Sequence, residues 1–218
     1  MPGTSIDSLD GEYQTLTEAC GLLDRSERGK LALSGAGAVE FLNGQVTNEL
    51  ATLRAGEGRY AAFLTPKGKM LGDLRILAVG SDRQAPPSEL LLDTERVALQ
   101  ALFDMIRRYR VGYDVQLHKH TLERGLISLV GPESAVVAGA VVPGDAGDGS
   151  RVEPADDEHA NAPVEIDGIA CLAVRTDTGV DLICEATATE RLLQALRGRG
   201  ASPVSEQATE CLRVERGR

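Results

Sequence analysis

The spacing of apolar residues along the chain alternates between helical and extended patterns. Apolar positions three and four residues apart predict amphipathic helices over about residues 38–50 and 94–108, with Asp93 as the expected N-cap of the second. Further helices are predicted near residues 187–196 and from 205 onward. Short apolar runs predict strands at 31–33, 60–64, 70–79, 90–92, 111–117, 126–130, 169–174 and 180–184. Strand clusters beside helices, with hairpins between them, indicate an α+β fold.

The chain divides into two halves, about residues 24–117 and 120–215, with a similar succession of strands and helices. This similarity indicates a structural duplication, although no clear sequence repeat accompanies it. Residues 1–17 are polar and are expected to be flexible, so the folded domain is expected over residues 18–218. Residues 143–163 are acidic and rich in Gly, Pro and Asp, and we interpret them as a mobile surface insertion.

Composition narrows the classes of partner. The 218 residues carry a formal net charge of −10, which repels phosphate backbones and anionic membranes. Aromatic residues make up 3% and Trp is absent, so stacking platforms for nucleic-acid bases are scarce. Non-specific nucleic-acid binding is therefore not expected, and an anionic small ligand would need a local cluster of Arg or Lys.

The cysteines and the hydropathy pattern bear on metal content and location. The four cysteines form no C-x-x-C pair and only three His are present, so no metal site is predicted. We interpret the cysteines as isolated buried thiols in a reducing compartment. No apolar stretch approaches the roughly 20 residues of a membrane span, and the first ten residues lack signal-peptide features. The sequence predicts a cytoplasmic protein without a membrane partner.

The segment Gly35-Ala36-Gly37 lies between a predicted strand and a predicted helix, as in a dinucleotide-binding fingerprint. The third glycine position of that fingerprint is occupied by Glu40, whose carboxylate would obstruct helix–strand packing and sit poorly beside a pyrophosphate. The following segments are hairpins instead of βαβ units. We therefore interpret the glycines as a tight strand-to-helix turn.

Five segments, taken together and in order, resemble a known family. They are residues 24–26 with 34–50 (which contain FLNGQVTNE), 58–64 with 66–75 (which contain PKGKMLGDLR), 129–132 (LVGP), Arg175 with 179–182 (GVDL), and 210–217 (ECLRVERG). This set is similar to the folate-binding superfamily of the glycine cleavage T-protein and YgfZ, over about residues 18–217. The string FLNGQVTNE, the segment KGKM and a single Asp at position 73 favour the YgfZ branch.

The resemblance implies an aminomethyltransferase-type folate-binding domain with duplicated strand-rich subdomains and tetrahydrofolate, or its 5-formyl or methylene form, in a central cavity. Asp181 matches a carboxylate that holds the pterin, because two N–H groups of a pterin can donate to one carboxylate. Arg213 matches an arginine that approaches the folate, and Tyr60 and Arg175 lie in matched segments and are expected to contribute to ligand binding. Taken alone, Asp181 reads as a strand-edge carboxylate and Arg213 as a helix-terminal cation.

Asp73 is the candidate catalytic residue. T-proteins carry an Asp-Asp pair on the strand after the glycine turn, and here the matching pair is Gly72-Asp73. A carboxylate near a reacting amine can orient it or stabilise developing positive charge. The alternative is a solvated residue on an alternating strand.

Three functions are open at this point, and whether the protein is an enzyme is open with them. The YgfZ-like interpretation is a tetrahydrofolate-binding accessory factor in iron–sulfur cluster assembly or repair or in tRNA modification, with iron–sulfur proteins as partners. The second is an aminomethyltransferase that passes a methylene unit from an aminomethyl-lipoyl carrier to tetrahydrofolate and releases ammonia. The third is a folate-free interaction scaffold. The sequence ends at Arg218, before the YgfZ motif K-G-C-Y-x-G-Q-E and the C-terminal barrel, so neither is expected in this chain.

Overall fold

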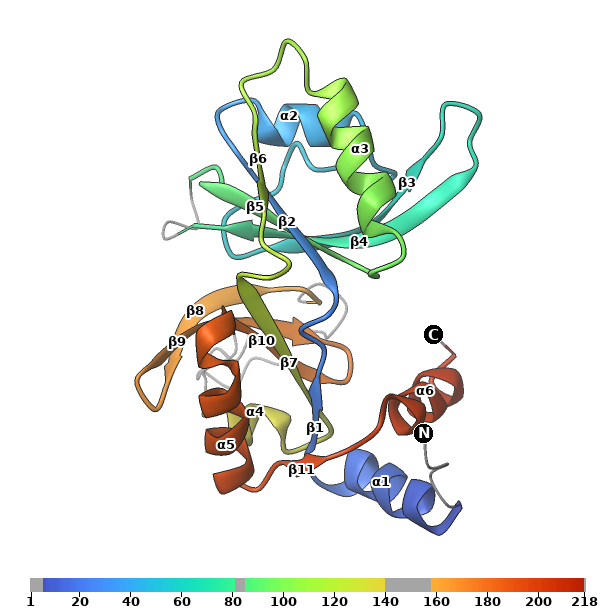
Figure 1. Ribbon diagram of the computed structural model, residues 1–218, viewed down its shortest axis with the longest axis vertical. Coiled ribbons are helices and arrows are strands. Elements are labelled where there is room, and N and C mark those ends of the chain that lie inside the picture. Colours follow the sequence, from blue (N-terminus) through green and yellow to red (C-terminus); the bar gives the residue numbers. More distant parts are fainter. Residues whose placement is uncertain (1–5, 81–84, 140–157, 218) are drawn as a thin grey trace. The chain divides into compact units, whose positions relative to one another are not determined.

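The computed structural model describes residues 6–80, 85–139 and 158–217. The chain forms two compact units, one spanning residues 1–26, 125–142 and 163–218 (unit 1) and one spanning 27–124 and 143–162 (unit 2). Each unit contains a sheet with helices packed on it (Figure 1), which confirms the predicted α+β class.

Unit 2 is a five-stranded sheet with two helices on one face. Its strands are β2 (Gly29–Ser34), β3 (Gly58–Leu64), β4 (Met70–Val79), β5 (Glu89–Thr94) and β6 (Gln116–Lys119), in the order β3-β4-β5-β2-β6. All neighbouring strands in this sheet are antiparallel. Helices α2 (Ala38–Asn43) and α3 (Leu99–Tyr109) cover a Leu-rich face of the sheet (Figure 1) and bury Phe41, Leu102 and Ile106 against it.

Unit 1 has a six-stranded sheet in the order β11-β1-β7-β10-β9-β8. Its strands are β1 (Gly21–Asp24), β7 (Arg124–Val130), β8 (Asn161–Ile166), β9 (Ile169–Thr176), β10 (Gly179–Glu185) and β11 (Ser202–Pro203). Its helices are α1 (Ile6–Glu18), α4 (Ser134–Ala138), α5 (Thr189–Gly198) and α6 (Glu206–Glu215), with a 3₁₀ turn at Ala186–Ala188. The core of this sheet combines residues of β7 and β10 with Leu192 and Leu196 of α5.

The two sheets share one arrangement of elements. The spatial order β3-β4-β5-β2-β6 in unit 2 corresponds to β8-β9-β10-β7-β11 in unit 1. Along the chain, each set of five strands has one helix after its first strand (β2 or β7) and one after its fourth (β5 or β10). Strand β1 is an additional strand in the sheet of unit 1, where it lies between β7 and β11 and pairs with both. The N-terminal segment therefore belongs to the unit that contains the C-terminus, and the halves expected from the sequence are not contiguous stretches of chain.

The expected flexibility of residues 1–17 is wrong for the part that the structure describes. Helix α1 begins at Ile6, and its residues Leu9, Tyr13 and Leu16 recur at spacings of four and three. Leu16 is fully buried and packs with Leu212 of α6. A helix with this apolar face is stabilised by a packing partner that lies about 200 residues away in sequence.

The expected insertion at 143–163 ends earlier than the sequence indicated. Residues 140–157 lie outside the described residues, but His159 and Asn161 are buried and β8 begins at Asn161. The Asn161 side chain donates to the backbone oxygen of Glu57 at 2.8 Å. Polar residues at the end of this span are therefore held by backbone hydrogen bonds and packing within unit 2.

The helix limits also differ from the expectation. Asp93 lies in β5, where its side chain forms ion pairs on the sheet, and α3 begins at Leu99. The turn after β2 agrees with the steric interpretation of its glycines. Gly35 has φ +107°, and a Cβ there would lie 2.4 Å from the backbone oxygen of Asp114.

Candidate functional site

A polar row crosses the sheet of unit 2 on the face opposite its apolar core. Cross-strand pairing places Tyr60 opposite Arg75, Arg75 opposite Asp93, and Asp93 opposite Lys30. Their sequence neighbours Leu31, Leu74, Ile76 and Leu92 point to the other face and belong to the core. The two-residue alternation of strands thus brings four polar side chains from four strands into one line.

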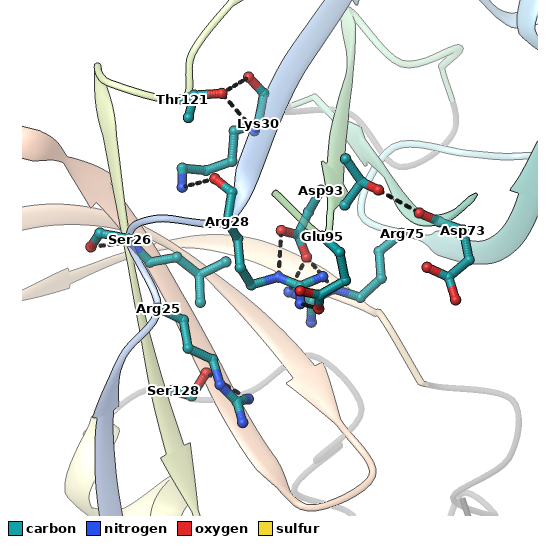
Figure 2. A network of polar contacts seen from close by, with 12 residues as sticks. Arg25, Ser26, Arg28, Lys30, Asp73, Arg75, Asp93, Glu95, Thr121 and Ser128 are labelled. Carbon is teal, nitrogen blue, oxygen red and sulfur yellow. Dashed lines mark hydrogen bonds and ion pairs between the residues drawn. The ribbon is translucent and has the colours of Figure 1, made fainter. Parts of the chain in front are cut away.

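Asp93 is the centre of this row, and its side chain is fully buried. Its Oδ1 accepts from Arg28 Nε at 2.9 Å, and its Oδ2 accepts from Arg75 Nε at 2.8 Å, with Arg75 Nη2 at 2.6 Å (Figure 2). Arg28 Nη1 also pairs with Glu95. Burial by itself would raise the pKa of Asp93, but the charges and hydrogen bonds of the two arginines outweigh burial and lower it.

Asp73 and Tyr60 form a second contact on the same face. The Tyr60 hydroxyl donates to the Asp73 carboxylate, and the Asp73 backbone oxygen accepts from Thr94 Oγ1 at 2.6 Å. Tyr60 is 53% exposed, so a ligand can reach its ring, while partial burial and the hydrogen bond to Asp73 raise its pKa to about 12. At neutral pH the tyrosine therefore stays a hydrogen-bond donor that orients the carboxylate.

The glycine at the start of β3 gives this tyrosine a close neighbour. A Cβ at Gly58 would lie 2.5 Å from the Cβ of His159, and the His159 ring centroid lies 6.4 Å from that of Tyr60. An exposed aromatic ring beside an oriented carboxylate can bind a flat ligand and a basic nitrogen together. The Tyr60–Asp73 pair is accordingly the candidate site of unit 2.

Asp181 and Arg175 lie on neighbouring strands of unit 1 but on opposite faces of the sheet. Asp181 pairs with Val174, and Arg175 pairs with Val180, which belongs to the unit 1 core. Asp181 is buried, with 4% of its surface exposed. The structure therefore does not bring these two predicted ligand-binding residues together on one face.

Arg213 lies on α6, where its guanidinium is exposed and paired within its own helix. Its Nε donates to Glu210 Oε2 at 2.7 Å, and its Nη2 lies 2.6 Å from Glu210 Oε1. This pairing raises the pKa of Arg213 and lowers that of Glu210. The Arg213 guanidinium is thus held at the surface by an ion pair with Glu210, one helical turn earlier.

Comparison with known proteins gives the family. The sequence matches the GCVT N-terminal domain over residues 4–218. The chain belongs to this family. One relative, the aminomethyltransferase of Chlorobaculum tepidum, is 30% identical over 215 residues, which cover 94% of this chain and 56% of the relative. The aminomethyltransferase of Chlorobaculum parvum is 29% identical over 229 residues, covering 100% and 58%.

The fold of this GCVT domain is shared with a solved structure, the glycine cleavage system aminomethyltransferase T from Bartonella henselae. The TM-score is 0.77 at 24% identity, and the match covers 100% of this chain and 56% of that one. The chain thus spans just over half the length of the relatives it matches. The resemblance to the T-protein superfamily is confirmed, whereas the narrower YgfZ assignment is not supported by these relatives, which are named aminomethyltransferases.

Two further observations concern the described part of this GCVT domain. None of its helices is both long and apolar enough to cross a membrane. Within the same residues, no three or more His, Cys, Asp or Glu side chains are grouped so that they could hold a metal ion.

Reasoning from the sequence missed the ion pairs of this GCVT domain. The sequence pattern predicts Asp93 as a helix cap and singles out neither Arg28 nor Lys30. A usable signal exists in the pattern: Asp93 directly follows the buried run 90–92, and a carboxylate in a buried strand requires cationic partners. Which cations supply them depends on strand pairing, and the sequence leaves that open.

Proposed function

We propose that this chain binds tetrahydrofolate and contributes Asp73 as the catalytic carboxylate of an aminomethyltransferase. The observation that carries the proposal is the Tyr60–Asp73 hydrogen bond on an accessible part of unit 2. The GCVT family membership and the aminomethyltransferase names of the relatives support it.

Asp73 suits the charge changes of such a transfer. On the methylene carbon, two folate nitrogens replace the ammonia nitrogen and the carrier sulfur, and the two folate protons end on ammonia and on the carrier thiol. Positive charge develops on the nitrogens during these steps, and a fixed carboxylate stabilises it. Tyr60 holds the carboxylate in place through the hydroxyl hydrogen bond.

Asp181 is the proposed pterin-binding residue and Arg213 the proposed partner for an anionic part of the folate. A buried carboxylate such as Asp181 can accept two pterin N–H groups in an environment where those bonds are strong. Arg213 is exposed, and an exposed ion pair stabilises little, so a ligand carboxylate can replace Glu210 at low cost. Arg175 points to the other face of its sheet from Asp181, and we leave it out of the proposed site.

Calorimetric titration with tetrahydrofolate and 5-formyltetrahydrofolate tests the binding part. The Asp181→Ala variant is expected to lose at least about tenfold in affinity, which corresponds to about 1.4 kcal/mol. Asp167→Asn is the matched control, because Asp167 forms an exposed ion pair with Arg199 elsewhere in unit 1. Unchanged affinity in Asp181→Ala would remove the pterin assignment.

Ammonia release from an aminomethyl-lipoyl carrier tests the transfer part. Asp73→Asn is expected to keep folate affinity within about threefold and to lower the transfer rate by about a hundredfold or more. A transfer rate equal to that of the unmodified chain would exclude Asp73 as the catalytic carboxylate.

A second candidate is the YgfZ-like accessory factor in iron–sulfur cluster assembly or tRNA modification. The string FLNGQVTNE and the single carboxylate at Gly72-Asp73 favour it. It differs from the first proposal in one measurable respect, because it predicts folate binding without ammonia release. A folate-free scaffold predicts neither.

A further inference from the structure

Two arginines and three carboxylates gather beside Tyr60 on the polar face of unit 2, and Asp93 and Glu95 pair with the arginines while Asp73 accepts from Tyr60. Asp73 and Arg75 are two residues apart on β4 and point to the same face. Such side chains start about 6–7 Å apart along a strand, which is within the reach of an arginine side chain. The Arg75 guanidinium nevertheless pairs with Asp93 (Figure 2). The Asp73 carboxylate instead accepts from the Tyr60 hydroxyl.

The contacts of Asp93 explain this distribution. Its carboxylate is fully buried and receives both the Nε and the Nη2 of Arg75 on one oxygen, at 2.8 and 2.6 Å. Ion pairs in a dry environment are stronger than those at the surface, so a buried carboxylate outcompetes the more exposed Asp73 for this guanidinium. Thr94, the residue after Asp93, also holds the backbone of Asp73 through the bond to its oxygen.

We infer that Asp93 is a positioning residue that keeps the Arg75 guanidinium away from Asp73, so that Asp73 stays bonded to Tyr60 and open to a basic nitrogen of the substrate. A guanidinium bound to Asp73 in a fork would occupy both carboxylate oxygens and cancel the negative charge. The consequence for catalysis rests on the proposed function of Asp73. The arrangement of the side chains does not depend on it.

The Asp93→Asn variant is expected to affect the two arginines differently. Arg28 keeps its pairing with Glu95 in this variant, whereas Arg75 loses the carboxylate that accepts its Nε and Nη2. Arg75 is then expected to turn toward Asp73, the carboxylate two residues before it on the same strand.

Titration of the Tyr60 phenol reports on this movement without any folate. Among the residues that the structure describes, the charged and titratable groups around Tyr60 include Asp73, Arg28, Glu95, Arg75 and His159. The measurement is NMR of protein labelled with ¹³C at the tyrosine Cζ, with the signal assigned by Tyr60→Phe. A guanidinium at Asp73 competes with the phenol and favours the phenolate, so the pKa is expected to fall from about 12 by about one unit or more in Asp93→Asn.

The double variant Arg75→Met/Asp93→Asn is the decisive comparison. It lacks the moving cation, so the pKa of Tyr60 is expected to return to within about 0.3 units of the unmodified chain. Asp167→Asn is the control for loss of an ion pair elsewhere and is expected to leave Tyr60 unchanged. The inference is overturned if Asp93→Asn leaves the pKa where it was, or if the double variant stays as low as the single one, since the effect is then a general loosening.

Arg75→Met alone provides a test that does not depend on the stability of Asp93→Asn, because Asp93 keeps Arg28. If Asp93 already neutralises Arg75, the pKa of Tyr60 is expected to stay within about 0.3 units. A change of about one unit would show that Arg75 acts on Asp73 in the native protein and would overturn the inference.

Ammonia release then connects this arrangement to function. Asp93→Asn is expected to lower transfer about tenfold or more, and the double variant to recover most of it. Absence of transfer by the unmodified chain counts against the proposed function, while the Tyr60 titrations still decide whether Asp93 restrains Arg75. Loss of transfer in both variants would contradict the positioning role.

Discussion

At the scale of single residues, the fully buried Asp93 depends on two arginines for its charge balance. Asp93 has no exposed surface and lies between two guanidinium groups, so its ionised form is the one that the fold accommodates. The same arrangement lowers its pKa, since the charges of Arg75 and Arg28 outweigh the effect of burial. A buried ion pair of this kind contributes mainly by avoiding the cost of isolated charges.

Removing this charge is expected to reduce stability in a pH-dependent way. Asp93→Asn removes the buried carboxylate that Arg28 and Arg75 share and is expected to cost about 3–5 kcal/mol at pH 7. Because the pKa of Asp93 is lower in the folded state than in the unfolded one, its contribution is present above about pH 4 and is lost as pH falls further. Urea unfolding at pH 7 and pH 3 should therefore give a difference between the two proteins that narrows at pH 3. A difference that is equal at both values would contradict this account.

At the scale of elements, the connection from β2 to α2 depends on the absence of a side chain. Gly35 combines φ +107° with a close approach to the backbone of Asp114, and Gly37 donates its N–H to the same backbone oxygen at 3.0 Å. Gly68, in the turn between β3 and β4, has φ +79°, but a Cβ there would have no other atom of the described residues within 4 Å. Gly35 and Gly68 thus both have a positive φ, but only at Gly35 would a side chain clash with neighbouring backbone.

Alanine substitution at these two glycines should separate the two effects. Gly68→Ala is expected to cost about 1–2 kcal/mol, the strain of a left-handed residue with a side chain. Gly35→Ala is expected to cost at least about 1 kcal/mol more, because backbone must also move to accept the methyl group. Equal losses in urea unfolding would mean that the contact with Asp114 relaxes without cost.

At the scale of the whole molecule, the two ends of the chain meet in unit 1. Helix α1 packs on α6, β1 pairs with β11, and Leu16 is buried with Leu23, Val130, Ala208 and Leu212. Contacts between segments so far apart in sequence close a loop of nearly the whole chain, which costs conformational entropy that the packing must offset. The N-terminal segment is therefore part of the folded core.

Leu16→Ala tests whether the joined ends carry stability. Deleting a fully buried leucine side chain is expected to cost about 2–5 kcal/mol. Leu122→Ala is the matched control, because Leu122 is 86% exposed, and its loss is expected within about 0.5 kcal/mol of zero. Similar stabilities of both variants in urea would mean that α1 contributes little to the fold.

The sequence by itself determined most of what is local. Apolar spacing predicted α2, α3, α5, α6 and most strands of the described residues but neither α1 nor α4, and the neighbouring strand runs 60–64 and 70–79 predicted the β3–β4 hairpin. Because a hairpin brings its two strands together without help from the rest of the chain, Tyr60 and Asp73 could be placed near one another from sequence and family resemblance. The opposite facing of Asp181 and Arg175 is equally local and follows from the register of the β9–β10 hairpin.

Only the tertiary structure decided which distant residues share an environment. Asp93 meets Arg28 from a segment 65 residues earlier, and α1 finds its partner in α6 at the other end of the chain. Residue spacing does not encode such pairings, because the cost of burying a charge or an apolar face depends on what the rest of the fold places against it. The elements were therefore predictable one by one, while the ion pairs around Asp73 and the joining of the chain ends followed from how strands far apart in sequence align.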